Sequence, residues 1–200
     1  MLKYRIIKPS EFLVHEWSGG TTAEIFLLPE TADYRKKDFE IRISSARILK
    51  EGTPYSDFRG FSRLICPIKG EMHIQHMHHH QAHLKTFEVD CFDGAWHTQS
   101  FGLCTDFNLL FAKNWKALMQ HRQGSFESVL EPFSYHCFFS CSEKPIKFYL
   151  ENNSVEPIAL NLETNDFLVL FPSESTVIKV NAEQEASMVY LSFVKSSDDI

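Results

Sequence analysis

Residues 39–46 have the sequence Phe-Glu-Ile-Arg-Ile-Ser-Ser-Ala, in which apolar and polar side chains alternate. Successive side chains of a β-strand point to opposite faces, so strict alternation is typical of a strand with one face in a core. Phe39, Ile41 and Ile43 would share the core face, and Glu40, Arg42, Ser44 and Ala46 the other. This stretch therefore predicts that the chain is built on β-sheets.

Further strand patterns follow along the chain, separated by turn residues at intervals of roughly 8 to 12 residues, the spacing of a sandwich or barrel. They cover residues 63–70, 72–76, 107–111, 145–150, 158–162, 166–171, 175–180 and 186–193. Pro67 predicts an edge strand or a bulge at 63–70, and residues 114–122 fit either a helix or a strand. Because alternating strand–helix units are absent, the pattern predicts an all-β fold and not a Rossmann or TIM architecture. The tail at 195–200 is expected to fray.

The composition is globular and acidic, with 44% hydrophobic residues and a net charge of −6 at pH 7. The basic residues are scattered, so we expect no nucleic-acid partner. No run approaches the roughly 20 apolar residues of a membrane span, and the first residues do not form a signal peptide. Five cysteines without a CxxC motif fit reduced thiols. We therefore expect a cytoplasmic protein with no membrane partner.

Two polar pairs at i and i+2 are candidates for a binding site: Arg42 with Ser44, and Asp106 with Asn108. If both pairs face one pocket, they form a compact polar site in an apolar wall, as small-ligand sites do. Arg42 or Arg63 would bind a carboxylate through two hydrogen bonds, and Asn108 would bind an amide. Asp106 would pair with one arginine in the absence of ligand. The alternative is that these residues are the solvent-facing sides of strands or a structural ion pair.

The segment from Trp17 to Thr22, Trp-Ser-Gly-Gly-Thr-Thr, is the second candidate. Paired glycines allow a tight turn and a close backbone approach, and their N–H groups can bind an anion. We include Trp17 and Thr21 among the candidate ligand-binding residues, at the rim of the pocket. The alternative is an ordinary loop in which Trp17 is a hydrophobic plug.

Several of these stretches together resemble the HutD/Ves family. They are Trp17–Ile25 with Pro29, Asp38–Ala46, Gly52–Arg63, Gly70 and Asp106–Asn108, whose order and spacing agree over about residues 10–112. The resemblance implies a double-stranded β-helix of the RmlC-like cupin (jelly-roll) type, with two cupin-like barrels in one chain. We expect an N-terminal half at 1–112 and a C-terminal half at 113–200. It also implies a link to histidine utilisation, and a regulatory protein that binds an acidic metabolite such as a formylated glutamate.

Histidines are concentrated after Gly70, where six of the ten fall between His73 and His83. Imidazole is a common neutral metal ligand, and His76 and His78 would share a strand face, with His80 joining them if the strand continues. Five residues separate Gly70 from His76, as in the cupin metal motif, but the expected glutamate position falls on Ala82 or His83. We therefore treat His76 and His78 as candidate metal ligands, with a solvated histidine-rich loop as the alternative.

Three functions remain open from the sequence. The first is a binding module for a small acidic metabolite, favoured because no nucleophile or general base is evident, so no catalytic residue and no cofactor is assigned. The second is a metal-dependent cupin enzyme, a dioxygenase or isomerase, that uses His76 and His78 with His83 as a further candidate to hold a divalent metal. The third is an interaction protein whose sheet edge pairs with a partner chain. The protein is expected to be a monomer or homodimer.

Overall fold

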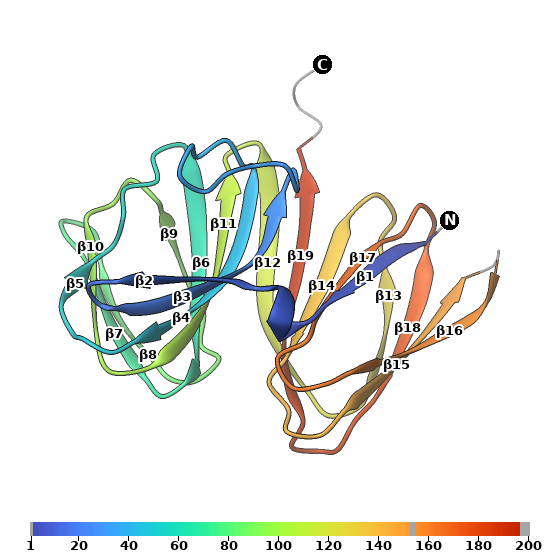
Figure 1. Cartoon of the computed structure of the whole chain (residues 1–200). Helices are drawn as coiled ribbons and strands as arrows, with labels where there is room; N and C mark the ends of the chain where they lie inside the picture. The colour runs from blue at the N-terminus through green and yellow to red at the C-terminus, as the bar shows by residue number, and fades with distance from the viewer. Residues whose placement is uncertain (1, 153–154, 197–200) are drawn as a thin grey trace. The chain divides into compact units, whose positions relative to one another are not determined.

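The computed structural model describes residues 2–152 and 155–196, and these residues form antiparallel β-strands joined by turns and loops (Figure 1). Within them, the one helix is a short 3-10 turn, η1 (Pro9–Glu11). The predicted all-β fold is confirmed. No helix in these ranges is long and apolar enough to cross a membrane.

The chain divides into two compact units, which we call the N-half unit (Phe12–Trp115) and the C-half unit (Met1–Glu11 with Lys116–Ile200). Each unit is built from two antiparallel sheets (Figure 1). The candidate residues from the sequence all lie in the N-half unit.

The N-half unit contains a six-stranded and a four-stranded sheet. In spatial order the first consists of β2 (Leu13–Trp17), β3 (Gly20–Leu28), β4 (Ile41–Ile48), β11 (Thr105–Ala112), β6 (Phe61–Lys69) and β9 (Asp90–Asp93). The second consists of β5 (Thr53–Pro54), β10 (Thr98–Phe101), β7 (Met72–His76) and β8 (Gln81–Leu84). A cluster of buried apolar residues, including Ile65, Ile74 and Phe92, brings together side chains from both sheets.

The strand register brings the polar positions of three neighbouring strands to one face of the six-stranded sheet. Ser44 of β4 pairs with Asn108 of β11, and Arg42 of β4 and Arg63 of β6 both pair with Leu110. Paired residues of neighbouring strands point to the same face, so the two polar i, i+2 pairs and Arg63 are neighbours. The strand that the alternation predicted at 39–46 begins at Ile41, and Phe39 lies outside it.

Two local predictions are resolved by the sheet. Pro67 belongs to β6, which lies between β11 and β9, so the edge-strand interpretation is wrong, although the pairing of β6 with β9 covers only Ser62–Ile65. The bulge is confirmed, because the register shifts where Asp106 pairs with Pro67 and Thr105 with Lys69. A bulge suits proline, which has no N–H to donate to the ladder. The ambiguous segment at 114–122 is a strand, β12 (Trp115–Gln123), with Trp115 and Met119 buried.

The C-half unit has a five-stranded and a four-stranded sheet. The first, in spatial order, consists of β1 (Lys3–Ile7), β17 (Phe167–Phe171), β14 (Tyr135–Ser140), β19 (Ser187–Lys195) and β12. The second consists of β13 (Phe126–Leu130), β18 (Thr176–Asn181), β15 (Ile146–Asn152) and β16 (Val155–Leu162). The predicted fraying of the tail falls mainly on residues 197–200, which lie outside the described residues.

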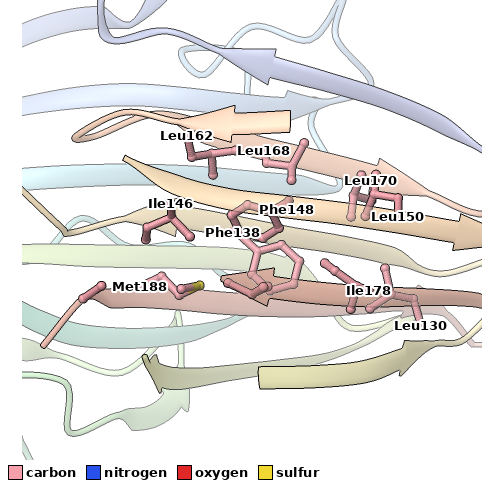
Figure 2. Close-up of a cluster of buried hydrophobic side chains, with 12 residues drawn as sticks. Leu130, Phe138, Ile146, Phe148, Leu150, Leu162, Leu168, Leu170, Ile178 and Met188 are labelled. Atoms are coloured by element: carbon pink, nitrogen blue, oxygen red, sulfur yellow. The ribbon is translucent and has the colours of Figure 1, made fainter. Parts of the chain in front are cut away.

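The core of the C-half unit is a cluster of twelve buried apolar side chains drawn from both of its sheets (Figure 2). Phe138 of β14 and Phe148 of β15 meet edge to face, with ring centroids 5.2 Å apart. Met188 of β19 and Ile178 of β18 are fully buried beside them. Burial of this much apolar surface is the main stabilising contribution in the unit.

Candidate functional site

The N-half unit contains a cavity of about 250 Å³, which is room for roughly eight water molecules or one amino-acid-sized ligand. Its walls combine polar side chains of the six-stranded sheet with aromatic side chains of the loops. The lining residues are His15, Glu16, Trp17, Thr22, Tyr34, Arg42, Ser44, Ala46, Ile48, Pro54, Tyr55, Ser56, Phe58, Arg63, Asp106 and Asn108. Six of the seven residues that the sequence singled out for ligand binding thus border one cavity; their binding role stays a prediction.

Arg42 is held rigidly in the wall of the cavity. Its side chain is buried, its Nε donates to Glu24 Oε2 at 2.9 Å, and its Nη1 donates to Ser44 Oγ at 3.1 Å. The guanidinium also lies over the ring of Tyr34, 4.2 Å from its centroid. These two hydrogen bonds use two of the five N–H donors of a guanidinium. Arg42 can therefore bind an anion without first losing conformational freedom.

Arg63 is positioned by different partners. Its Nε donates to Asn108 Oδ1 at 3.2 Å, and its guanidinium lies 4.6 Å from the ring centroid of Tyr55. Burial lowers the pKa of Arg63, and burial raises the pKa of the Tyr55 phenol. Because ordinary arginine titrates far above neutrality, the cavity still contains a second guanidinium cation next to a neutral phenol.

Asp106 borders the cavity and belongs to the same hydrogen-bond network as Arg63. The Asn108 amide donates to Asp106 Oδ1 while the Asn108 carbonyl accepts from Arg63, so Asn108 links the carboxyl to the arginine. Burial raises the pKa of Asp106 to about 7, although the charge of Arg63 and hydrogen bonds from Ala46 and Asn108 oppose the shift. Near neutral pH this carboxyl can accept a hydrogen bond when ionised or donate one when protonated.

The expected ion pair between Asp106 and an arginine is not the one that forms. Arg42 pairs with Glu24, and Asp106 connects to Arg63 through the amide of Asn108. The reason is the register: Glu24 of β3 lies beside Ser44 of β4, on the face where Arg42 points. Sequence reasoning missed Glu24, although a lone acidic residue among apolar ones in a strand was a usable signal.

The structure places Thr22 at the cavity, and not Thr21 as predicted. Thr21 pairs with Arg47, whose side chain is exposed, whereas Thr22 pairs with Ala46 and borders the cavity. A shift of one residue along a strand moves a side chain to the opposite face. Thr21 therefore does not line the cavity, and Thr22 takes the position assigned to it.

Gly19 and Gly20 let Trp17 and β3 approach their neighbours closely. A Cβ atom on Gly19 would lie 2.0 Å from the Trp17 ring, and one on Gly20, where φ is +154°, would lie 1.9 Å from the carbonyl oxygen of Arg47. No side chain fits in either place. The Gly19 carbonyl also accepts from Leu49 N at 2.8 Å. The two glycines thus allow Trp17 to close one side of the cavity.

The histidine cluster folds differently from the predicted strand face. β7 ends at His76, and His78 lies in the following turn with φ of 66°. The interpretation that His76 and His78 share a strand face is therefore wrong, because the chain reverses direction between them. His83 contacts Glu71 instead, with its Nε2 3.0 Å from Glu71 Oε2. The residues gathered near His76 are His80 and Asp90, and the ligand atoms of all three lie within 4.8 Å of one another.

All five cysteines are free thiols, as expected for a reduced protein. Burial raises the pKa of both Cys104 and Cys141 to about 12. A thiolate is the nucleophilic and metal-binding form of cysteine, so these two groups are inert at neutral pH.

The family model described as HutD matches residues 10–189 of the chain. The chain belongs to the HutD family. The resemblance seen in the sequence is thus confirmed, and the matched region extends well beyond the first half of the chain. No match was found among curated protein sequences.

Several solved structures share the fold. A conserved protein of unknown function, PA5104 from Pseudomonas aeruginosa PAO1, superposes with a TM-score of 0.83 at 20% identity, covering 96% of this chain and 100% of that one. HutD from Pseudomonas fluorescens SBW25, in a formate condition, superposes with a TM-score of 0.78 at 20% identity, covering 98% of this chain and 100% of that one. An oxalate decarboxylase from Lactobacillus farciminis, in complex with formate, superposes with a TM-score of 0.68 at 9% identity, covering 96% of this chain and 86% of that one. This HutD-family chain therefore has a cupin-like jelly-roll fold.

Oxalate decarboxylase from Bacillus subtilis, which shares the fold at a TM-score of 0.61 and 9% identity over 98% of this chain and 78% of that one, has Mn(II) centres. The cavity does not fit such a metal, because Arg42 and Arg63 place two cations in its walls. The group formed by His76, His80 and Asp90 does fit, since it offers imidazole nitrogens and a carboxylate. That group is not part of the cavity lining.

Proposed function

We propose that this HutD-family protein binds a small acidic metabolite in the N-half cavity and has a regulatory and not a catalytic role. The proposed ligand class is an N-acylated dicarboxylic amino acid, of which formylated glutamate is the test case. One observation carries the proposal: two guanidiniums with fixed orientation border the same small cavity together with an amide and a carboxyl group.

The chemistry of the walls matches that ligand class group by group. Arg42 and Arg63 suit the two carboxylates, because guanidinium donors match carboxylate geometry and charge-assisted hydrogen bonds are strong. Asn108 and the carboxyl of Asp106 suit the formamide, which needs one donor and one acceptor. The aromatic rings of Tyr34, Tyr55 and Trp17 shield these contacts from water and strengthen them.

Finer features of the proposal concern the whole chain. We infer that each unit is one cupin-like barrel, so that the two units correspond to the two barrels expected on either side of residue 112. Two antiparallel sheets in each unit support this inference. A cytoplasmic location, a monomeric or homodimeric state and a link to histidine utilisation remain part of the proposal.

The test is titration calorimetry with N-formyl-L-glutamate, compared with formate, glutamate and N-formylglycine. We expect 1:1 binding of the formylated dicarboxylate and weaker binding of each comparator, because glutamate and N-formylglycine each lack one of the three recognised groups and formate lacks two. Arg63→Gln should weaken binding by roughly 10- to 100-fold, the loss expected when a hydrogen bond to a charged group is removed. For Arg42 the double variant Glu24→Gln/Arg42→Gln is preferable, because it leaves no unpaired charge in the wall.

Two arginines outside the cavity serve as matched controls, one on β4, the strand of Arg42, and one in a loop. Arg47 lies on β4 with an exposed side chain, and the Arg59 side chain is 83% exposed and bonds to Asp57. Arg47→Gln and Arg59→Gln should leave the affinity unchanged. Absence of binding by the unmodified protein, or equal losses for Arg63→Gln and the two controls, would overturn the proposed function.

The alternative, a metal-dependent cupin enzyme, requires the metal to reach a substrate in the cavity. His76, His80 and Asp90 are not among the cavity-lining residues, and Phe92 contacts both His76 and Arg63. This separation favours the binding protein over the enzyme.

A further inference from the structure

The hairpin between β7 and β8 brings two histidines side by side. His76 N donates to the carbonyl of His80 at 2.9 Å, and His79 N donates to the carbonyl of His76 at 3.0 Å. The left-handed φ of His78 completes the reversal. The rings of His76 and His80 consequently lie with centroids 4.5 Å apart. Turn geometry, and not a shared strand face, is what pairs them.

A carboxylate from the other sheet of the same unit meets this pair. Asp90 is the first residue of β9, and it pairs with Ile65 of β6. Its Oδ2 lies 2.8 Å from His76 Nε2, and its Oδ1 lies 3.1 Å from His80 Nε2. One carboxylate thus joins two imidazoles with both of its oxygens. The three residues connect the six-stranded and the four-stranded sheet.

The other nitrogen of His76 is held by a hydroxyl. His76 Nδ1 lies 2.8 Å from Thr98 Oγ1, and Thr98 Oγ1 donates to the carbonyl of Trp96 at 3.3 Å. A hydroxyl has a single proton, so when it donates to Trp96 it must accept from Nδ1–H of His76. In this tautomer of the neutral ring, Nε2 presents its lone pair to Asp90; in the other, Thr98 donates to Nδ1 and Nε2–H donates to Asp90. Orientation of a ligating histidine through its second nitrogen is common in metal sites.

The first tautomer places two acceptors opposite each other and leaves between them a position for a cation, which the Nε2 proton occupies in the second. A neutral imidazole Nε2 and an ionised carboxylate repel unless a proton or a metal ion lies between them. The His76 side chain is fully buried while that of His80 is 41% exposed, so a cation can enter from the His80 side.

We propose that His76 Nε2, His80 Nε2 and the carboxylate of Asp90 bind one transition-metal ion of the Zn²⁺ type. Two nitrogens and one oxygen suit Zn²⁺, Ni²⁺ or Co²⁺, whereas Ca²⁺ and Mg²⁺ prefer oxygen ligands. In a tetrahedral Zn²⁺ site the ligand atoms lie about 3.4 Å apart. The two imidazole–carboxylate pairs, now 2.8 and 3.1 Å apart, must therefore open slightly, and any pair near the 4.8 Å limit of the group must close. The exposed His80 at a turn can supply this movement.

The metal would act as a clasp between sheets, and not as a catalyst in the cavity. Asp90 belongs to the six-stranded sheet, whereas His76 and His80 belong to the β7–β8 hairpin of the four-stranded sheet. A metal that binds only the folded unit stabilises it by mass action. The test uses metal alone and no organic ligand. A protein that binds no metal could still bind the acidic metabolite, and a protein that binds no metabolite could still bind the metal.

The experiment is calorimetric titration of the chelator-treated full chain with Zn²⁺, with Co²⁺ as a spectroscopic probe. We expect one tight site per chain and, with Co²⁺, the visible absorption of a four-coordinate ion. Trp96, whose ring centroid lies 5.5 Å from that of His76 and 5.7 Å from that of His80, should lose fluorescence when Ni²⁺ binds. Trp96→Phe should abolish that signal and retain binding.

Two variants test ligands, and a third tests the hydroxyl that orients His76. Asp90→Asn and His80→Gln should each weaken Zn²⁺ binding by at least 100-fold. Thr98→Val, which removes only the partner of Nδ1, should weaken it by about 10- to 100-fold. The exposed position of His80 makes His80→Gln informative even if Asp90→Asn fails to fold.

A second histidine pair in the same hairpin provides the control. His73 and His83 have ring centroids 5.0 Å apart, and His83 bonds to the exposed Glu71. His73→Gln/His83→Gln should retain the tight site. Loss of the site in this control but not in His80→Gln would show adventitious binding by surface histidines and overturn the proposal, as would the absence of any Zn²⁺ binding by the unmodified protein.

Discussion

In both units two antiparallel sheets bury side chains between them, but the chemistry of the buried residues differs. The C-half core is a cluster of twelve apolar side chains (Figure 2). The N-half unit buries Arg42, Asp106 and Asn108 in the wall of a cavity, with the buried Glu24 paired to Arg42. Buried charges cost free energy unless they are paired. The N-half unit thus has a polar site in addition to its own apolar clusters, whereas in the C-half unit the buried carboxyl of Asp166 pairs with Lys8.

The largest expected effect is in the apolar core. Phe148→Ala removes a fully buried ring that packs on Phe138, and it should lower the free energy of unfolding by about 4 kcal/mol. Urea denaturation measures this change. Phe133→Ala is the matched control, because that side chain is 67% exposed, and it should cost less than about 0.5 kcal/mol. Similar losses for the two variants would contradict the assignment of this core.

The next effect concerns the buried ion pair of the N-half unit. Glu24→Gln leaves the guanidinium of Arg42 buried without its counter-charge, and we expect a loss of about 3 kcal/mol in unfolding free energy. The double variant Glu24→Gln/Arg42→Met should recover much of this loss, because it removes the charge as well. Chemical denaturation of single and double variants measures the coupling. Additive losses would mean that the two residues do not stabilise each other.

Asp106 should make the stability of the N-half unit depend on pH. Its pKa is about 7 in the folded protein and 3.8 ordinarily, so between these values the folded state binds more protons than the unfolded state. Stability therefore falls as pH rises, and this group should contribute a loss of about 2 kcal/mol between about pH 5.5 and 8. Asp106→Asn should remove that part of the slope in denaturation curves. An unchanged slope would show that the carboxyl is ionised throughout.

The smallest effect tests a polar atom in the C-half unit. Ser140 Oγ is buried without a hydrogen-bond partner among the described residues. Ser140→Ala should leave stability unchanged or raise it by up to about 1 kcal/mol, since an unsatisfied hydroxyl is removed. The melting temperature is the measurement, and Ser140→Ala should not alter ligand binding in the other unit. A clear loss of stability would point to a bound water at this hydroxyl.

The sequence was most informative where local alternation decides the structure. The patterns around Arg42 and Asn108 predicted strands and placed each polar pair on one face, and β4 and β11 then bring these faces together. β2 escaped prediction because all five of its residues are exposed, so it has no alternation of burial. The family resemblance supplied the cupin-like fold, which no local pattern determines.

The remaining site residues depend on partners that are distant in the sequence. Glu24 reaches Arg42 across 18 positions through the register of β3 with β4, and Asp90 reaches His76 across 14. The exchange of Thr21 for Thr22 follows from the same register. His80 replaces His78 because of a turn. Alternation predicts faces well, but it carries no information on register or on the residue at which a strand ends.

The pairing of β1 with β17 has a consequence for synthesis on the ribosome. Lys3 pairs with Phe171 and Ile7 with Phe167, although β1 is translated well before β17 and the whole N-half unit lies between them in the sequence. The N-half unit has all its strands once residue 115 has emerged, and the 56 residues from there to Phe171 take about 3 to 11 seconds to translate. During that interval the β1 segment lacks the strand with which it pairs, so it stays accessible to a chaperone.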